Sequence, residues 1–285
     1  MRALITGAGG QLGRALQACA PAGVTVIAPP ETDFDITDPA TVARVIAESR
    51  ADIVFNAAAY TAVDKAEADA ALAQRINADA VALLAAHAPR LVHVSTDFVF
   101  DGTASRPYAP DAAPNPVSAY GATKLAGEIA AGPDALIVRT AWVYAAVGSN
   151  FVHTMLRVMR ANNPERPEVR VVADQIGTPT HVAGLARALW ALNAAGARGV
   201  HHWTDAGAAS WYDFAVAIQE EALALGLLDR AVPVIPIRTE DYPTPAQRPA
   251  YSVLDKTSAW AITGPAPHWR TELRLCLAII KDAQP

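Results

Sequence analysis

A phenol and an amine are spaced for acid–base chemistry near the middle of the chain. Tyr120 and Lys124 stand four residues apart in a stretch that we expect to be helical, so they share one helix face. A free phenol titrates near pH 10, and a neighbouring ammonium group favours the phenolate. We therefore expect the pKa of Tyr120 to fall by about three units, roughly 4 kcal/mol, which suits a proton relay. A solvated Tyr/Lys pair on a helix surface is the alternative.

A hydroxyl group precedes this pair. Thr96 follows the apolar run 91–94 and stands 24 residues before Tyr120. At the end of a buried strand, its hydroxyl can hydrogen-bond the carbonyl oxygen that Tyr120 protonates. Taken alone, Thr96 also suits a turn or a cap. Because Thr96, Tyr120 and Lys124 occur in this order behind a glycine-rich segment, we predict that all three are catalytic.

The glycine-rich segment follows the first apolar run of the chain. Gly7, Gly10 and Gly13 form G-x-x-G-x-x-G, which permits a tight turn, close approach of the backbone to a pyrophosphate, and packing of a helix on a strand. A helix that begins near Gln11 and Leu12 directs free N–H groups toward the anion. The pattern predicts dinucleotide binding, and an ordinary glycine-rich turn is the alternative.

Two further segments follow predicted strands, where open α/β sheets bind ligands. Asp35 and Ile36 would offer a carboxylate and an apolar wall to an adenine, although Asp35 also suits a turn cap. Small side chains at Ala57, Ala58 and Ala59 would let a ligand approach the backbone, although such a run also suits a helix. No charged residue stands at the tip of the second strand, so the sequence leaves NADH and NADPH open.

The elements that must position these residues follow from the alternation of short apolar runs with alanine-rich stretches. This alternation predicts βαβ units and a parallel sheet. Asp38 and Pro39 mark one helix start, because Asp caps and Pro suits the first turn. The predicted strands are 4–5, 24–28, 53–55, 91–94 and 136–138, and the predicted helices are 11–19, 41–50, 66–87 and 120–131.

The second half of the chain changes character, because prolines divide it into short pieces. We expect an α/β fold in which residues 1–165 form a Rossmann-type doubly wound parallel sheet that binds NAD(P). Residues 181–202 are expected to return to this sheet as a helix (181–192) and a strand (199–202). Residues 203–285 are expected to form a smaller C-terminal substrate-binding lobe, closed by a helix from about 270 to 281.

Composition narrows the class of protein. The chain has 285 residues, 52% of them hydrophobic, and can bury a substantial core. Its net charge of −5 argues against a nucleic-acid partner. We find no stretch with the length of a membrane span or of a signal peptide's apolar core. Cys19 and Cys276 give no disulfide framework. We therefore expect a cytoplasmic enzyme, and we assign no metal because the histidines show no ligand spacing.

These motifs resemble the extended short-chain dehydrogenase/reductase superfamily, and within it the dTDP-4-dehydrorhamnose reductase family. The resemblance implies that the first lobe binds NADPH, or NADH, and that the smaller lobe covers a dTDP-sugar. It implies Tyr120 as proton donor, Lys124 as its electrostatic partner and Thr96 as the residue that positions the carbonyl, with Asp97 and Trp142 at the substrate. The matching stretches cover most of the chain in order: 7–13, 56–67, 95–102, 120–128, 139–144, 150–151, 174–180 and 242–249.

The activity implied by this resemblance is reduction of a C4 ketone on a dTDP-linked 6-deoxyhexose, by a monomer or a homodimer. One alternative is an epimerase or dehydratase of the same fold, although dehydratases of the superfamily typically carry an Asp-Glu pair where this chain has Asp97 and Phe98. Another is a regulatory subunit similar to the β subunit of methionine adenosyltransferase, which would not need the phenol/ammonium pair. Without the family, Asp97 also suits a turn cap and Trp142 a core aromatic.

Overall fold

The central sheet of the computed structural model, which describes residues 1–160 and 168–283, contains six parallel strands. Chain order reverses between β1 and β3, so the sheet is doubly wound, and open sheets of this kind bind ligands at that reversal. The predicted Rossmann-type fold class is confirmed. The strand order is β2 (Thr25–Ile27), β1 (Arg2–Thr6), β3 (Ile53–Asn56), β4 (Leu91–Thr96), β5 (Leu136–Thr140) and β10 (Gly199–His202).

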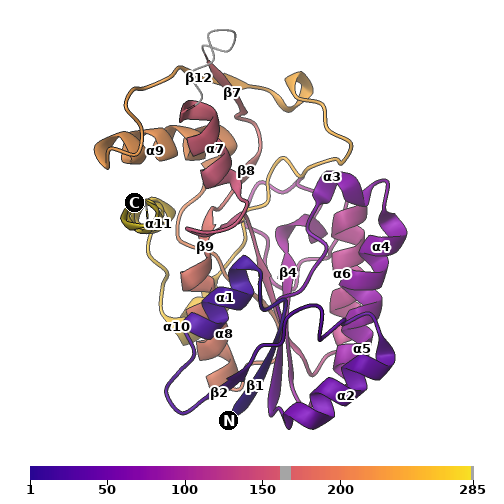
Figure 1. Cartoon of the computed structure of the whole chain (residues 1–285). Helices are drawn as coiled ribbons and strands as arrows, with labels where there is room; N and C mark the ends of the chain where they lie inside the picture. The colour runs from indigo at the N-terminus through magenta and orange to yellow at the C-terminus, as the bar shows by residue number, and fades with distance from the viewer. Residues whose placement is uncertain (161–167, 284–285) are drawn as a thin grey trace.

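Helices cover both faces of this sheet, which explains why the strands read as continuous apolar runs. Residues of β3 and β5 are buried throughout. The two layers are visible in Figure 1: α1 (Gln11–Ala18), α8 (Val182–Ala194) and α10 (Thr257–Thr263) on one face, and α2 (Pro39–Ser49), α5 (Ala80–His87) and α6 (Ala119–Ala131) on the other.

The start of α2 is the one that the sequence predicted. The Asp38 carboxylate accepts hydrogen bonds from the backbone nitrogens of Ala40 and Thr41, at 3.3 and 3.0 Å, and Pro39 opens the helix. The cap satisfies N–H groups that have no partner within the helix, and the ring of proline fixes a helical φ. Local chemistry alone therefore fixes this boundary.

The single helix predicted over residues 66–87 is correct only from Ala70 onward, because a turn at residues 67–69 separates α3 from the rest, and the remaining helix widens to a π-helical turn at Asn77. The side chain of Asn77 accepts from the Tyr60 nitrogen at 2.9 Å and donates to Thr123 Oγ1 on α6 at 3.2 Å. A wider turn around Asn77 accommodates these tertiary bonds, as π-helical turns often do. The segment is divided into α3 (Val63–Ala66), α4 (Ala70–Gln74), the π-helical turn η1 (Arg75–Asp79) and α5.

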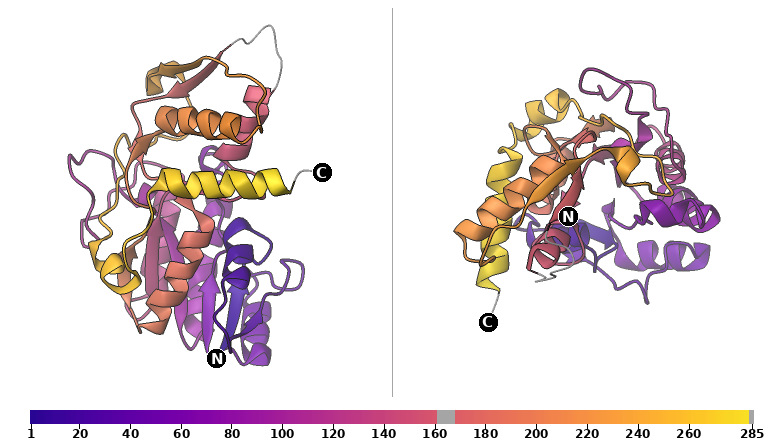
Figure 2. Two further views of the ribbon diagram at one scale, coloured as in Figure 1. Left: turned by 90° about the vertical axis from the view of Figure 1, so that its left-hand side faces the viewer. Right: turned by 90° about the horizontal axis from the view of Figure 1, so that it is seen from above.

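A second lobe lies over the carboxyl ends of the strands (Figure 1), and the C-terminal helix runs along its side (Figure 2). Its core surrounds Phe214 and Leu273. The lobe contains α7 (Phe151–Arg160), α9 (Trp211–Ala224) and α11 (Trp269–Asp282), with the strand pairs β6 (Val143–Tyr144) and β9 (Thr180–His181), β7 (Val169–Val172) and β12 (Val234–Ile237), and β8 (Ile176–Gly177) and β11 (Ala209–Ser210).

The division of the chain between the lobes stays a prediction. The boundary predicted at residue 165 lies outside the described residues. Helix α7 precedes it in sequence and packs with α9 and α11 in the core of the second lobe, which favours an earlier boundary. Within residues 1–160 and 168–283, none of the helices combines the length and the hydropathy of a bilayer-spanning segment.

Gly127 of α6 permits the close contact between this helix and η1, since an ideal Cβ there would lie 2.0 Å from the Asn77 carbonyl oxygen. We expect Gly127→Ala to lower the free energy of unfolding by about 1–3 kcal/mol, because the two helices must separate. Urea unfolding measures this loss. Gly9→Ala is the matched control, since a Cβ at Gly9 meets no atom within 4 Å. Equal stability of the two variants would contradict the proposed contact.

Candidate active site

The glycine-rich loop meets the segment that follows β3. Gly7 has a φ of +61°, and a Cβ there would lie 2.8 Å from the Ala58 nitrogen. At Gly13 a Cβ would lie 2.2 Å from the Gly7 carbonyl oxygen. Neither position accepts a side chain without moving backbone, and Gly7 also needs the left-handed conformation. The structure thus brings the predicted glycine loop against the predicted Ala57–Ala59 segment.

The first turn of α1 presents backbone N–H groups with no side-chain cap. Its N-cap is Gly10, and no acidic residue occupies the first turn. An uncapped helix N-terminus beside a glycine cradle fits a diphosphate. Gln11 links this turn to the second lobe, because its Oε1 accepts from Asn150 Nδ2 at 2.9 Å and its Nε2 donates to the Ser149 carbonyl at 3.4 Å. Leu12 packs against the core of the sheet.

The Asp35–Ile36 segment forms a turn after β2. Asp35 Oδ1 accepts hydrogen bonds from the nitrogen and the hydroxyl of Thr37, both at 2.8 Å, and Arg75 Nη2 donates to the same hydroxyl at 3.0 Å. The side chain of Ile36 is buried in the core beside α2. Asp35 therefore caps a turn while its carboxylate stays exposed, and the expected contact of both residues with an adenine stays a prediction.

Thr96, Asp97 and Tyr120 meet where α6 packs against the end of β4. The Thr96 hydroxyl donates to Asp97 Oδ1 at 3.0 Å and lies close enough to the Tyr120 phenol to lower its pKa. The ring of Phe98, in the short helix η2 (Asp97–Val99), stands edge-on to the Tyr120 ring with centroids 5.5 Å apart. The structure thus brings together three residues that the sequence placed on two separate elements.

Lys124 lies one turn beyond Tyr120 on α6 and is buried to 2% exposure. Its Nζ donates to the Val94 carbonyl of β4 at 2.7 Å. Burial lowers the pKa of Lys124 to about 8, and the negative charge of Glu128 opposes that shift. The amine is therefore mostly charged at neutral pH, and its charge is fixed against the strand that ends at Thr96.

The predicted fall in the pKa of Tyr120 is wrong. Burial raises the pKa of the phenol to about 12, the neighbouring Thr96 hydroxyl opposes this rise, and the charge of Asp97 adds to it. Sequence spacing indicates a nearby ammonium group but not the loss of water around the phenol, and that loss disfavours the phenolate. The phenol keeps its proton at neutral pH, which is the form that a proton donor requires.

Asp97 is held from the far end of the chain. Ser252 Oγ donates to Asp97 Oδ2 at 2.6 Å across 155 residues of sequence. Burial raises the pKa of Asp97 to about 6, although hydrogen bonds from Ser252 and Thr96 lower it. A role as a turn cap does not account for all the contacts of Asp97, because its carboxyl group also accepts a hydrogen bond from Ser252 in the second half of the chain. No sequence signal identified Ser252.

Trp142 stacks on Trp211 of α9, with ring centroids 3.6 Å apart and planes 7° apart. Its φ of +47° is strained for a tryptophan, and an ideal Cβ at Gly177 would lie 2.6 Å from its ring. Its position is thus fixed by the second lobe. Trp211, which the sequence analysis missed, lines a pocket of about 320 Å³ together with Phe151, Thr154, Met155, Arg170, Val171, Val172, Gln175, Tyr242, Thr244 and Arg248.

Arg248 joins this pocket to the first lobe. Its Nη1 and Nη2 donate to the two carboxylate oxygens of Asp64 on α3, at 3.0 and 2.8 Å. Two parallel charge-assisted bonds fix the direction of the guanidinium. Both residues lie in stretches that carried the family resemblance, which was the available signal for them, but sequence spacing could not pair residues so far apart.

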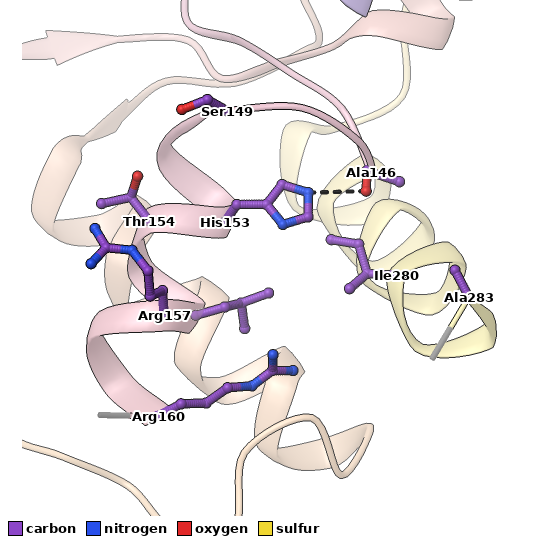
Figure 3. Close-up of a pocket in the computed structure, with 9 residues that line it drawn as sticks. Ala146, Ser149, His153, Thr154, Arg157, Arg160, Ile280 and Ala283 are labelled. Atoms are coloured by element: carbon purple, nitrogen blue, oxygen red, sulfur yellow. Dashed lines mark hydrogen bonds between the residues drawn. The ribbon is translucent and has the colours of Figure 1, made fainter. Parts of the chain in front are cut away.

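A larger hollow of about 750 Å³ lies between α7 and α11. Figure 3 shows His153 directed at the Ala146 carbonyl, 2.9 Å from it, with Arg157 and Arg160 further along α7. None of the described residues that line this hollow is a predicted site residue. The larger hollow is therefore not the candidate active site. In the described ranges, no group of three or more His, Cys, Asp and Glu side chains is arranged to hold a metal ion.

Comparison with known proteins identifies the family. The family model named RmlD substrate binding domain matches residues 1–281. A dTDP-4-dehydrorhamnose reductase of Burkholderia thailandensis is 44% identical over 296 residues, which cover 97% of this chain and 98% of that protein. The chain belongs to the dTDP-4-dehydrorhamnose reductase family. A reductase of Mycobacterium tuberculosis is 43% identical over 97% of this chain and 92% of its own length, and the resemblance read from the motifs is confirmed.

Solved structures of dTDP-4-dehydrorhamnose reductases share the architecture. The protein of Clostridium acetobutylicum superposes with a TM-score of 0.90 at 40% identity, covering 99% of this chain and 100% of its own. That of Bacillus anthracis, in complex with NADP, gives 0.89 at 36% identity, covering 98% and 99%. A UDP-glucose 4-epimerase of Thermus thermophilus gives 0.82 at 21% identity, with both chains fully covered, and this likeness shows the fold alone.

Asp97→Asn should be more stable than the wild type at neutral pH. Because burial raises the pKa of Asp97 from 3.8 to about 6, the wild type loses stability as the pH rises through this range, and the asparagine does not ionise. We expect equal stability near pH 4 and a gain of about 1–3 kcal/mol near pH 8, measured by urea unfolding at each pH.

Asp101→Asn is the control for which we expect the opposite change in stability. Hydrogen bonds from the Thr103 nitrogen and from Tyr108 hold the pKa of Asp101 well below its usual value, so its replacement should lower stability at neutral pH. If the stability of Asp97→Asn relative to the wild type did not rise with pH, the buried carboxyl would not ionise as described.

Proposed function

We propose that this chain catalyses the NADPH-dependent reduction of the C4 ketone of dTDP-4-dehydro-6-deoxy-L-mannose to dTDP-L-rhamnose, with NADH as the alternative reductant. The observation that carries the proposal is the buried placement of the Thr96 hydroxyl next to the Tyr120 phenol, with Lys124 one helical turn away, at the end of β4. The names of the relatives from Burkholderia thailandensis and Mycobacterium tuberculosis support the substrate. The NADP complex of the Bacillus anthracis protein supports the cofactor.

The cofactor is held by the glycine-rich loop and the segments beside it. The missing side chains at Gly7 and Gly13 and the uncapped turn at Gly10 fit its diphosphate. When bound, NADPH supplies the hydride that converts the carbonyl to an alcohol. The proposed contacts are Gly7, Gly10, Gln11, Leu12, Gly13, Asp35, Ile36, Ala57, Ala58, Ala59, Tyr120 and Lys124.

Tyr120 donates the proton to the carbonyl oxygen. With a pKa of about 12 it carries this proton throughout the neutral range. Thr96 hydrogen-bonds the same oxygen and orients it toward the phenol. Lys124, with a pKa of about 8, supplies a positive charge that stabilises the phenolate left behind. Fixed groups in surroundings that exclude water make these interactions stronger than they would be in solution.

The nucleotide part of the substrate occupies the pocket of about 320 Å³ in the second lobe. Its aromatic groups, Trp211 and Tyr242, offer flat apolar surface to the thymine, and Arg170 offers paired donors to the diphosphate. Asp97 and Trp142 contact the sugar. The reaction takes place in the cytoplasm, which the two free thiols Cys19 and Cys276 support.

Purified protein should consume NADPH only when the keto-sugar nucleotide is present, with one dTDP-rhamnose formed for each NADPH oxidised. The absorbance of the reduced nicotinamide follows the reaction, and chromatography identifies the product. Catalytic rather than stoichiometric use of the cofactor would indicate an epimerase or a dehydratase, which regenerates it. Absence of keto-sugar-dependent turnover with both NADPH and NADH would rule out the proposed reaction.

Tyr120→Phe should lower kcat by about 10²–10⁴-fold, because the proton donor is lost, while the dissociation constant for NADPH changes little. Steady-state kinetics and fluorescence titration measure the two quantities. Tyr212→Phe, a phenol on α9 in the second lobe, is the matched control and should keep normal turnover. Near-normal turnover of Tyr120→Phe would show that the proton comes from another group.

A further inference from the structure

Glu128 lies one turn beyond Lys124 on the same face of α6 and is fully engaged beneath the candidate active site. Its side chain is 4% exposed. The carboxylate accepts from Arg139 Nε and Nη2 at 2.8 and 2.7 Å, and Ser95, next to Thr96 on β4, donates to it as well. Three donor atoms from the two strands β4 and β5 thus fix this carboxylate in one place.

Arg139 extends the network across the sheet. It belongs to β5, and its Nη1 lies 3.3 Å from His202 Nε2 on β10 and from the Pro110 carbonyl. Its guanidinium also stands 5.1 Å from the centre of the Phe100 ring. Through Glu128 and Arg139, helix α6 is therefore connected to the strands β4, β5 and β10. These connections lie next to the proposed catalytic residues.

The surroundings of Lys124 otherwise do little to keep it charged. Burial disfavours the ammonium form. The Tyr120 phenol is neutral, and burial holds the pKa of His93 well below its usual value, so that imidazole is neutral too. Glu128 is the negative group whose position is fixed one turn away. The charged or titratable groups that act on or respond to Lys124 are Glu128 of α6 and His93 of β4, whereas Asp97 of η2 acts on Tyr120 and Arg139 of β5 is bonded to Glu128.

We propose that Glu128 is a positioning residue for Lys124: from one helical turn away it keeps charged the amine that is bonded to β4, and Arg139 and Ser95 hold the carboxylate there for that purpose. The inference rests on the role proposed above for Lys124. A buried ion pair is weak evidence for a role in stability, because an apolar pair of similar volume often serves the fold as well. A carboxylate one turn from a buried amine, in contrast, has an electrostatic effect that no apolar residue reproduces.

The first test measures the pKa of Lys124 by NMR of protein labelled with ¹³C in its lysines. The chain has four lysines, at 65, 124, 256 and 281, so the signals can be assigned by substitution. We expect the pKa of Lys124 to fall from about 8 by about one unit or more in Glu128→Gln. The other three lysines should not shift.

A double variant separates the electrostatic role from a structural one. Glu128→Gln alone leaves the Arg139 charge buried without a partner, which is destabilising. Glu128→Gln with Arg139→Gln leaves no such charge, so we expect it to fold and still to show the lowered pKa of Lys124. A wild-type pKa in this double variant, or its failure to fold, would assign the pair to the fold and overturn the proposal.

Glu272→Gln is the control for loss of a buried carboxylate elsewhere. Glu272 of α11 is hydrogen-bonded to His181 in the second lobe, and its replacement should leave the pKa of Lys124 unchanged. An equal shift of Lys124 in this control would mean that the effect is general loosening of the protein, and the proposal would fail.

Turnover gives the second readout. Since the charged form of Lys124 is the active one, the fall of kcat on the alkaline side should begin at lower pH in both Glu128 variants than in the wild type, with KM for the sugar nucleotide retained. An unshifted alkaline limb would contradict the proposal. If the wild type lacks keto-sugar-dependent turnover, the proposed function fails, and the NMR titration still decides whether Glu128 controls Lys124.

Discussion

Exclusion of water from the contact between α6 and β4 is the constraint on which the candidate site depends. It acts on three ionisable groups in the same sense, toward the uncharged form: the pKa of Tyr120 rises to about 12, that of Lys124 falls to about 8 and that of Asp97 rises to about 6. Hydrogen bonds from Lys124 to the Val94 carbonyl and from Ser252 to Asp97 partly compensate. The same dry surroundings that make these charges costly make each remaining interaction strong.

The parts of the molecule that could be predicted are those whose cause lies within a few residues. Buried strands are continuous apolar runs because helices cover both faces. Asp38 caps its own helix, and Gly13 is required by its contact with Gly7 and Ala8 of the same turn. The four-residue spacing of Tyr120 and Lys124 likewise follows from helix geometry alone.

The parts that could not be predicted depend on residues far apart in sequence. The π-helical turn exists because the Asn77 side chain bonds Tyr60 and Thr123. The stack of Trp142 on Trp211 requires α9 to fold against the loop after β5. The direction of the Tyr120 pKa was wrong for the same reason, since spacing indicates which charges are near but not how much water is lost.

The side-chain amide of Gln11 joins the two lobes. This side chain belongs to the first turn of α1, yet both of its polar atoms are bonded to the segment that leads into α7 of the other lobe. Any opening of the two lobes must break these bonds and free the amide beside the glycine loop. Under the proposed function, a dinucleotide at the glycine loop and a sugar in the second lobe would be coupled through this amide, and by thermodynamic reciprocity each would alter the affinity for the other.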